Sequence, residues 1–229
     1  RKSSLDFVLE NLDTIPPEKG IFLNTTRRLN KKICKFISDS FYESRLTPHE
    51  EATSRSVKLK LDPIKDEGIF YVPIDHFGCS QRSDEEADLI EKTYNKIIDK
   101  EFKVEDKEGQ ISPKDIMVVA PYNAQANNIR ERLNKKYKDD VRVGTIDLFQ
   151  GQEAKIVLIS MTTSDVESLP RHKDFFFSRN RLNVAISRAQ CVAIIIFNEK
   201  LLLASTNSIE EMKLMNNFCK LLKFKTNYK

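Results

Sequence analysis

The chain alternates short apolar runs with longer segments in which apolar residues recur at helical spacing. The runs are rich in Val and Ile, which favours strands over helices. They predict strands at Ile21–Leu23, Ile69–Ile74, Ile116–Ala120, Val141–Thr145, Ile156–Met161 and Cys191–Phe197. Because apolar strands that alternate with helices are typical of parallel sheets, we expect an α/β fold with helices on both faces of a mainly parallel sheet.

The helices are expected between these strands. Apolar residues recur at helical spacing from Leu29 to Phe41, and Ser83-Asp84-Glu85-Glu86 has the pattern of a capping box that opens a second helix. Further helices are predicted at Tyr122–Tyr137, Arg179–Ala189 and Met212–Leu222. The polar stretches predict loops at Glu43–Asp66, Lys100–Ser112 and Thr163–Ser178. Because no internal repeat or linker is visible, residues 1–229 are expected to form a single domain.

Composition is typical of a globular protein but does not identify a partner. Hydrophobic residues make up 40% and charged residues 31% of the 229 positions, and the net charge is only +4. Such a charge permits a local basic face without predicting one. The longest apolar run, Cys191–Phe197, is far too short to cross a membrane. Since no signal peptide is visible and the chain begins at Arg1, we expect a cytoplasmic protein and an excised fragment.

The cysteines at positions 34, 79, 191 and 219 do not form a metal-binding pattern. None is close enough to another for a CxxC pair, and the three histidines do not complete a ligand set. Cys34 falls on an apolar helical face and Cys191 opens an apolar strand, as is typical of small buried residues. We therefore expect reduced thiols and no metal site.

Three polar segments adjoin the ends of apolar runs and contain the candidates for chemistry. They read VVAPYNAQ at 118–125, VGTIDLFQGQE at 143–153 and RLNVAISRA at 181–189. In α/β proteins, ligands bind where strands pass into helices. In this order the segments resemble motifs IV, V and VI of superfamily 1 helicases, in the branch of the RNA-surveillance helicases and the replication nuclease-helicases. The resemblance implies the second of two RecA-like motor domains.

The likeness extends from about Ile21 to Cys219. Within it, residues 80–90 and 160–189 look particularly like bacterial proteins that join a RecB-type nuclease to a helicase. This narrower resemblance implies DNA rather than RNA as the bound strand. It also leaves open a nuclease domain fused upstream in the full-length protein.

No phosphate-binding loop is visible in the sequence. The six glycines are isolated, and none precedes a Lys-Ser or Lys-Thr pair. The string Asp84-Glu85-Glu86-Ala87-Asp88 is similar to a DEAD-type metal motif, but it opens a helix, where acidic residues complement the helix dipole. The resemblance therefore implies that ATP binds between this domain and a partner RecA-like domain that carries the phosphate loop and the Mg²⁺ ligands. The chain alone is expected not to hydrolyse ATP.

Arg181 and Arg188 lie seven residues apart and so on nearly one face of the predicted helix. By itself this arrangement fits exposed surface charge. Phosphoryl transfer, however, needs a cation against the charge that develops on the phosphate oxygens, and a planar guanidinium suits that role. By resemblance to motif VI, Arg188 is an arginine finger toward the γ-phosphate of ATP. Arg181 is by the same resemblance a further member of the nucleotide site.

A second arginine finger is implied nearer the amino terminus. The strings LNTTRRL at 23–29 and FYESRL at 41–46 occupy the places of a Gln-Tyr-Arg type motif and its Phe-Tyr continuation. The arginine of that family motif contacts the γ-phosphate and aligns best with Arg28. Thr26 and Arg27 replace the usual Gln and Tyr, which leaves Arg27 as the alternative.

The remaining candidates lie in motifs V and IV. The resemblance to motif V places Gly151 and Glu153 near the ribose and phosphates of the nucleotide, and Thr145 against a nucleic-acid phosphate. Tyr122 and Asn123 open a predicted helix whose amino-terminal amides favour anions, here the phosphates of a single strand. Tyr122 is either a stacking face for a base or a packed aromatic residue at the strand–helix junction.

The leading hypothesis is the second motor domain of an ATP-dependent superfamily 1 helicase that acts on single-stranded nucleic acid. The alternative is a non-catalytic RecA-like module that binds nucleic acid or protein. Arg28 and Arg188 favour the motor, because a pure binding module needs neither arginine against a γ-phosphate. The interpretation of this chain itself as a nuclease domain is disfavoured, since the chain has no compact set of carboxylates and lysine to hold a metal and activate water.

Overall fold

The computed structural model describes residues 14–104, 107–164 and 179–203, together with positions 9, 12, 212, 215, 216, 219 and 220. Its centre is a five-stranded sheet with the order β4-β10-β9-β7-β8. The strands are β4 (Gly68–Pro73), β7 (Ile116–Val119), β8 (Arg142–Gly144), β9 (Ala154–Ser160) and β10 (Ala189–Phe197). Every pairing in this sheet is parallel. All carboxyl ends therefore meet at one edge, the carboxyl edge, and all amino ends at the other, the amino edge.

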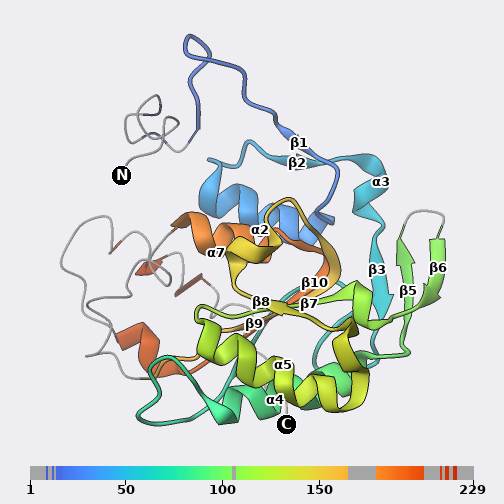
Figure 1. The fold of residues 1–229 in the computed structure, drawn as a ribbon. Helices are drawn as coiled ribbons and strands as arrows, with labels where there is room; N and C mark the ends of the chain where they lie inside the picture. Colours follow the sequence, from blue (N-terminus) through green and yellow to red (C-terminus); the bar gives the residue numbers. More distant parts are fainter. Residues whose placement is uncertain are drawn as a thin grey trace.

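Helices cover both faces of the sheet (Figure 1). One face carries α2 (Lys31–Phe41) and α7 (Arg179–Ile186), and the other carries α4 (Asp84–Ile97) and α5 (Asn123–Tyr137). Successive strand residues point to opposite faces, so Val157 joins the core under α2 and α7, whereas Leu158 joins the core under α4 and α5. The α/β fold expected from the apolar runs, a parallel sheet with helices on both faces, is confirmed.

The helices begin at side chains that also tie them to the sheet. Asn30 caps α2 by accepting a hydrogen bond from the backbone N–H of Ile33 at 2.9 Å, and its amide donates to the carbonyl of Cys191 at 2.6 Å. Ser83 caps α4 by accepting from the N–H of Glu86 at 3.1 Å. The reciprocal half of the expected capping box is absent, because the N–H of Ser83 instead donates to Gln125.

The expected strand at Ile21–Leu23 is wrong. Ile21 is 88% and Leu23 is 82% exposed, and these residues have no strand partner in the described part of the chain. The nearby strand is β1 (Thr25–Thr26), which pairs in parallel with β2 (Thr47–Pro48). A strand is defined by backbone pairing, so the polar threonines form one where the apolar run does not.

Two expected loops contain regular structure. Glu43–Asp66 includes β2, α3 (Glu50–Thr53) and β3 (Ser56–Lys58), and Lys100–Ser112 folds into the hairpin β5 (Glu101–Val104) and β6 (Lys107–Gln110). These strands form a small antiparallel sheet of order β3-β5-β6. It buries Val57 and Val104 while an ion pair joins Lys58 to Glu101 at 2.9 Å on the exposed face. Such a half-polar sheet lacks the continuous apolar runs that mark buried strands.

The remaining differences from the predicted elements concern where elements begin and end, and two predicted elements lie mostly outside the described residues. The helix expected at Arg179–Ala189 ends at Ile186, because Ala189 already pairs with Ala154 in the sheet. Single 3₁₀ turns occupy Pro113–Asp115, Lys138–Asp140, Ile146–Phe149 and Glu199–Leu203. Most of the expected loop Thr163–Ser178 and of the expected helix Met212–Leu222 lies outside the described residues. Among the residues that are described, no helix is long and apolar enough to cross a membrane.

Candidate functional site

Three distant segments meet at the amino edge of the sheet. Glu153 directly precedes β9 and Arg188 directly precedes β10, and these neighbouring strands pair at Ala154 and Ala189. Arg28 comes from the segment before α2, which the cap residue Asn30 ties to β10. Parallel topology therefore brings together residues 28, 153 and 188, which the sequence assigned to the nucleotide site.

Direct contacts fix these side chains. The Nε of Arg28 donates to a carboxylate oxygen of Glu153 at 2.7 Å, and one of its Nη atoms donates to the carbonyl of Ser187 at 3.2 Å. Arg188 donates from Nη1 to the carbonyl of Gln152 at 3.1 Å. Each arginine thus holds the backbone of the loop that bears the other site residues.

The amino edge has more positive than negative charge around its centre. Arg188 is only 9% exposed, and its Nε has no hydrogen-bond partner among the described residues. Burial lowers the pKa of Arg188, nearby Arg28 lowers it further, and Glu153 raises it. Arg28 bonds the Glu153 carboxylate, which also acts electrostatically on Arg188, and the Nε of Arg188 is left unsatisfied among the described residues. This arrangement is suited to an anion, whose oxygen would satisfy the Arg188 Nε.

Arg27, the alternative to Arg28, lies elsewhere. Its side chain is 74% exposed and forms a long ion pair of 3.7 Å with Glu51 of α3. The corresponding side chain of Arg28 is 30% exposed. The structure therefore places Arg28, and not Arg27, beside Glu153 and Arg188.

The loop before β9 is held by residues that sequence reasoning did not single out. Arg142 at the start of β8 donates to the carbonyl of Glu153 at 3.1 Å and to the side chain of Gln152 at 3.0 Å. Gln190 donates to the second carboxylate oxygen of Glu153 at 2.8 Å. Arg55 donates to the carbonyl of Arg28 at 2.8 Å. Gln190 follows the motif VI string directly, so position alone offered a signal there, whereas Arg142 and Arg55 carried none.

Gly151 turns the chain into this loop. Its φ of +77° lies in the left-handed region that favours glycine, while a Cβ at this position would meet no atom within 4 Å. The glycine is therefore needed for the turn rather than for space. The resemblance places Gly151 near the nucleotide, and the conformation gives a physical reason for a glycine at this point.

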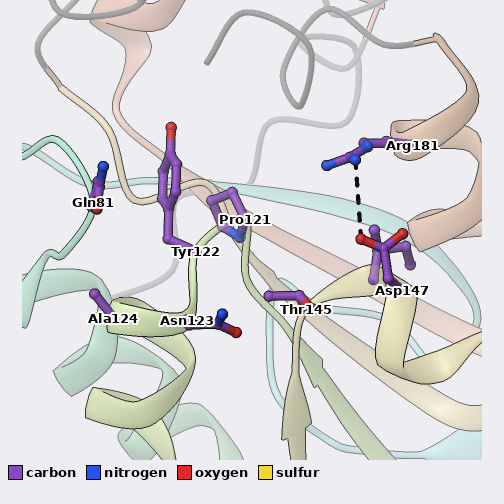
Figure 2. A pocket seen from close by; sticks show the side chains of 9 residues that line it. Gln81, Pro121, Tyr122, Asn123, Ala124, Thr145, Asp147 and Arg181 are labelled. Atoms are coloured by element: carbon purple, nitrogen blue, oxygen red, sulfur yellow. Dashed lines mark ion pairs between the residues drawn. The ribbon is translucent and has the colours of Figure 1, made fainter. Parts of the chain in front are cut away.

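The carboxyl edge holds the second group of expected residues. A pocket of about 400 Å³ is lined by Gln81, Pro121, Tyr122, Asn123, Ala124, Thr145, Ile146, Asp147 and Arg181. Figure 2 shows Tyr122 and Gln81 on one side of it, Arg181 with Asp147 on the other, and Asn123 and Thr145 between them. The structure thus brings together Tyr122, Asn123 and Thr145, the residues expected to contact a strand.

Two adjacent strands position these residues. β7 and β8 pair at Val119 and Gly144, so the segments that follow them leave the sheet side by side. Tyr122 is the residue before the first turn of α5, and Asn123 begins that helix. Burial raises the pKa of Tyr122, and a hydrogen bond with Thr163 lowers it in part. Tyr122 is therefore partly packed at the strand–helix junction and still lines the pocket.

A second pocket connects the two edges. It measures about 260 Å³ and is lined by Ile146, Asp147, Gln150, Arg181, Val184 and Arg188. It shares Ile146, Asp147 and Arg181 with the first pocket. Arg181, assigned from the sequence to the nucleotide site, lies on the wall between the two pockets, with Asp147 at 4.0 Å.

A buried polar network supports the carboxyl edge from below. Glu86 is fully buried and accepts hydrogen bonds from the N–H of Thr162 at 2.8 Å and from the hydroxyl of Ser160, while His76 lies 3.0 Å away. Thr162 adopts a φ of +70°, a conformation that residues with a side chain rarely adopt. Gln125, also buried, bonds both backbone groups of Ser83 and the hydroxyl of Ser160.

Glu86 was expected only to complement the helix dipole. Its carboxylate instead joins α4 to the end of β9, while Ser83 alone caps the helix. Local sequence carries no signal for the contacts of Glu86 with Ser160 and Thr162, because these partners lie 74 and 76 residues away. The network holds the segment from Ser160 to Thr163, and Thr163 in turn bonds the carbonyl of Ser80 next to the pocket.

The four cysteines are free in the structure. Cys34 and Cys191 are fully buried, as expected of small core residues, and burial raises their pKa to about 11 and about 12. Within the described ranges, no group of three or more His, Cys, Asp or Glu residues could hold a metal ion.

Comparison with known protein families identifies the family of this chain. A family model described as an AAA domain matches residues 3–200. The chain belongs to this family. The match spans both the amino-edge and the carboxyl-edge residues, so both groups lie inside the shared domain.

Curated relatives are named as helicases. The chain is 34% identical to the DNA polymerase alpha-associated DNA helicase A of Schizosaccharomyces pombe over 179 residues, which cover 73% of this chain and 26% of that protein. It is 32% identical to an uncharacterised ATP-dependent helicase of Methanocaldococcus jannaschii over 196 residues, covering 81% and 28%. It is 29% identical to the putative helicase MOV-10 of Gallus gallus over 198 residues, covering 76% and 20%.

The chain therefore spans between 20% and 28% of the length of these relatives. The family match and the helicase relatives bear out the coarse recognition of a helicase-type motor domain. The closer likeness to RecB-type nuclease–helicase fusions stays a prediction.

Proposed function

We propose that this chain is the second motor domain of an ATP-dependent superfamily 1 helicase. In this proposal residues 1–229 form one RecA-like domain. Its amino edge supplies arginine fingers to ATP bound against a partner domain, and its carboxyl edge supplies part of the groove for a single strand. ATP with Mg²⁺ is the expected nucleotide, and the Mg²⁺ ligands are expected on the partner RecA-like domain.

The convergence of Arg28, Glu153 and Arg188 is the observation that carries the proposal. Arg188 is 9% exposed and its Nε lacks a partner in the described structure, so a phosphate oxygen is a fitting acceptor. Arg28, from the segment before α2, is held beside it by contacts with Glu153 and Ser187. Guanidinium groups held in this way stabilise charge on a transferring phosphoryl group without reorganising during the reaction.

Glu153 and Gly151 fit the nucleotide side of the same site. The Glu153 carboxylate is fixed by Arg28 and Gln190, and its backbone carbonyl is fixed by Arg142. Gly151 lets the chain turn so that this carboxylate lies beside the arginines. We propose that Glu153 orients Arg28 and lies near the ribose or phosphates, while Arg188 makes the closest phosphate contact.

The pocket at the carboxyl edge supports the strand-binding half of the proposal. Tyr122, Asn123 and Thr145 offer an aromatic face, an amide and a hydroxyl, and none of these reads a particular base. A motor that moves along a strand needs such sequence-tolerant contacts. We propose DNA as the strand in preference to RNA, and a fused nuclease domain as a further partner in the full-length protein.

The test is ATP hydrolysis by two proteins, the full-length protein and the 229-residue chain, with and without single-stranded DNA or RNA. We expect turnover stimulated by the strand, more by DNA, in the full-length protein and none above a buffer blank in the chain alone. ATP hydrolysis by the chain alone that is lost in Arg188→Ala would contradict the half-site assignment. Tight, sequence-selective strand binding without any ATP hydrolysis by the full-length protein would favour a non-catalytic binding module.

A further inference from the structure

Arg181 lies between the two pockets of the domain. It lines the carboxyl-edge pocket together with Tyr122 and Thr145, and it lines the second pocket together with Arg188. Its guanidinium is 4.0 Å from the carboxylate of Asp147, and the two side chains are 43% and 78% exposed. Figure 2 shows this pair facing the side of the pocket that holds Tyr122.

The charges in the carboxyl-edge pocket pose a problem for strand binding. Of the residues that line it, only Arg181 and Asp147 are charged, so their charges cancel. A phosphate that enters the pocket would meet an exposed carboxylate as well as a guanidinium. The carboxylate repels the phosphate unless a cation stays between them.

The ion pair is also weakly held. At 4.0 Å between exposed groups, the attraction between Arg181 and Asp147 is screened by solvent and salt. A phosphate can accept two parallel hydrogen bonds from a guanidinium, which is the stronger geometry. The exchange of one anionic partner for the other is therefore favourable at low salt.

We propose that Arg181 is a backbone-phosphate contact of the bound strand, and that Asp147 is the partner that it leaves on binding. This inference rests on the proposed function, since it takes the carboxyl-edge pocket as part of the strand groove. It assigns Arg181 to the strand rather than to the nucleotide. Thr145 and Asn123 then offer neutral donors to the same backbone, and Arg181 provides the charge.

The exchange also reaches the nucleotide side. Asp147 and Arg181 line the second pocket beside Arg188, so a guanidinium that turns toward the strand changes the charge next to that arginine. A strand in the groove therefore alters the electrostatic surroundings of Arg188 without touching it. The bound strand and Arg188, the residue proposed to contact the nucleotide, are thereby coupled through electrostatics.

The experiment measures strand binding by the full-length protein without nucleotide, using a fluorescent oligothymidylate over about 50 to 300 mM salt. Arg181→Ala is expected to weaken binding about five- to tenfold at the lowest salt. It should also reduce the slope of log K against log salt by about 0.7, the value for one phosphate contact on a single strand. Asp147→Asn is expected to strengthen binding about two- to fivefold with an unchanged slope, because the contact remains and its competitor is gone.

Two variants complete the test. Arg181→Lys keeps the charge, so it should retain the slope while losing part of the affinity. Arg27→Ala is the matched control, since Arg27 is another exposed arginine in one long ion pair, of 3.7 Å, and lies away from both pockets. It should bind as the unmodified protein does.

An unchanged affinity and slope in Arg181→Ala would overturn the proposal. So would intact strand binding combined with about tenfold weaker binding of a fluorescent ATP analogue, which would return Arg181 to the nucleotide site. Failure of the proposed function looks different, because then the unmodified full-length protein itself neither binds the strand nor hydrolyses ATP. An unchanged thermal unfolding midpoint for Arg181→Ala separates a lost contact from a lost fold.

Discussion

The two edges of the central sheet hold their functional residues in different ways. At the amino edge, Arg28 and Arg188 are bound to backbone carbonyls, and Arg188 is 9% exposed. At the carboxyl edge, Arg181 and Asp147 are more exposed, and their ion pair is long, at 4.0 Å. A fixed guanidinium suits a reaction with one geometry, whereas a movable one suits a polymer that passes through. The contrast matches the two proposed ligands, a nucleotide and a strand.

The largest expected effect is at the amino edge. In the full-length protein, Arg188→Ala should lower strand-stimulated ATP turnover by about 10³- to 10⁵-fold, because the guanidinium proposed to contact the transferring phosphate is lost. Strand binding without nucleotide should change less than about twofold. Steady-state hydrolysis and fluorescence anisotropy measure the two quantities. Arg27→Ala serves as the control, and a loss below about tenfold would transfer the main role to Arg28.

The next largest effect is expected for the buried network around Glu86, beneath the carboxyl edge. Glu86→Ala removes a fully buried carboxylate and leaves Ser160, Thr162 and His76 without their acceptor. We expect the free energy of unfolding to fall by about 3–5 kcal/mol, measured by urea titration. The neighbouring exposed Glu85→Ala should lose less than about 1 kcal/mol. Equal losses in the two variants would show that the network does not hold this edge.

Binding at the carboxyl edge should be moderately sensitive to Tyr122. Tyr122→Ala is expected to weaken binding of a single strand by about 1–3 kcal/mol through loss of base stacking, with an unchanged salt slope. Tyr122→Phe keeps the ring and should bind almost normally. If the phenylalanine variant is as weak as the alanine variant, the hydroxyl contact with Thr163 is the important one, and Tyr122 is a packing residue.

The smallest effect concerns the ion pair of the amino edge. The side chains of Arg28 and Glu153 are 30% and 45% exposed, so solvent screens their attraction. A double-mutant cycle with Arg28→Ala and Glu153→Ala should give a coupling of about 0.2–1 kcal/mol in the free energy of unfolding. A coupling above about 2 kcal/mol would mean that the pair exists for stability, which would blur the contrast between the edges.

The central sheet could be predicted because its strands are buried on both faces. Cys191–Phe197 and Ile116–Ala120 are continuous apolar runs, and they coincide with β10 and with β7, which ends at Val119. The small sheet could not, because β5 and β6 expose most of their side chains and depend on partners such as Lys58 and Lys155. Local sequence does not record that pairing.

The site residues likewise include some that the sequence could predict and some that it could not. Arg28, Glu153 and Arg188 were recognised through motif resemblance, and the parallel topology explains why they meet. Arg142, Gln190 and the buried network around Glu86 could not be anticipated, because each depends on partners brought near only by the fold. Whether an acidic residue in a first helical turn lies in solvent or in the core is decided by what packs above it.

The helix α7 joins the two proposed sites mechanically. It has 8 residues, so its axis is about 12 Å long at about 1.5 Å per residue. Arg181 lies near one end, and Arg188 lies two residues beyond the other, with Ala185 and Ile186 buried in between. A rod of this length tilts as one body, so a small rotation at the strand groove would move the opposite end by a comparable amount. Work done on the strand and the position of the arginine that faces the nucleotide would then be linked by simple mechanics.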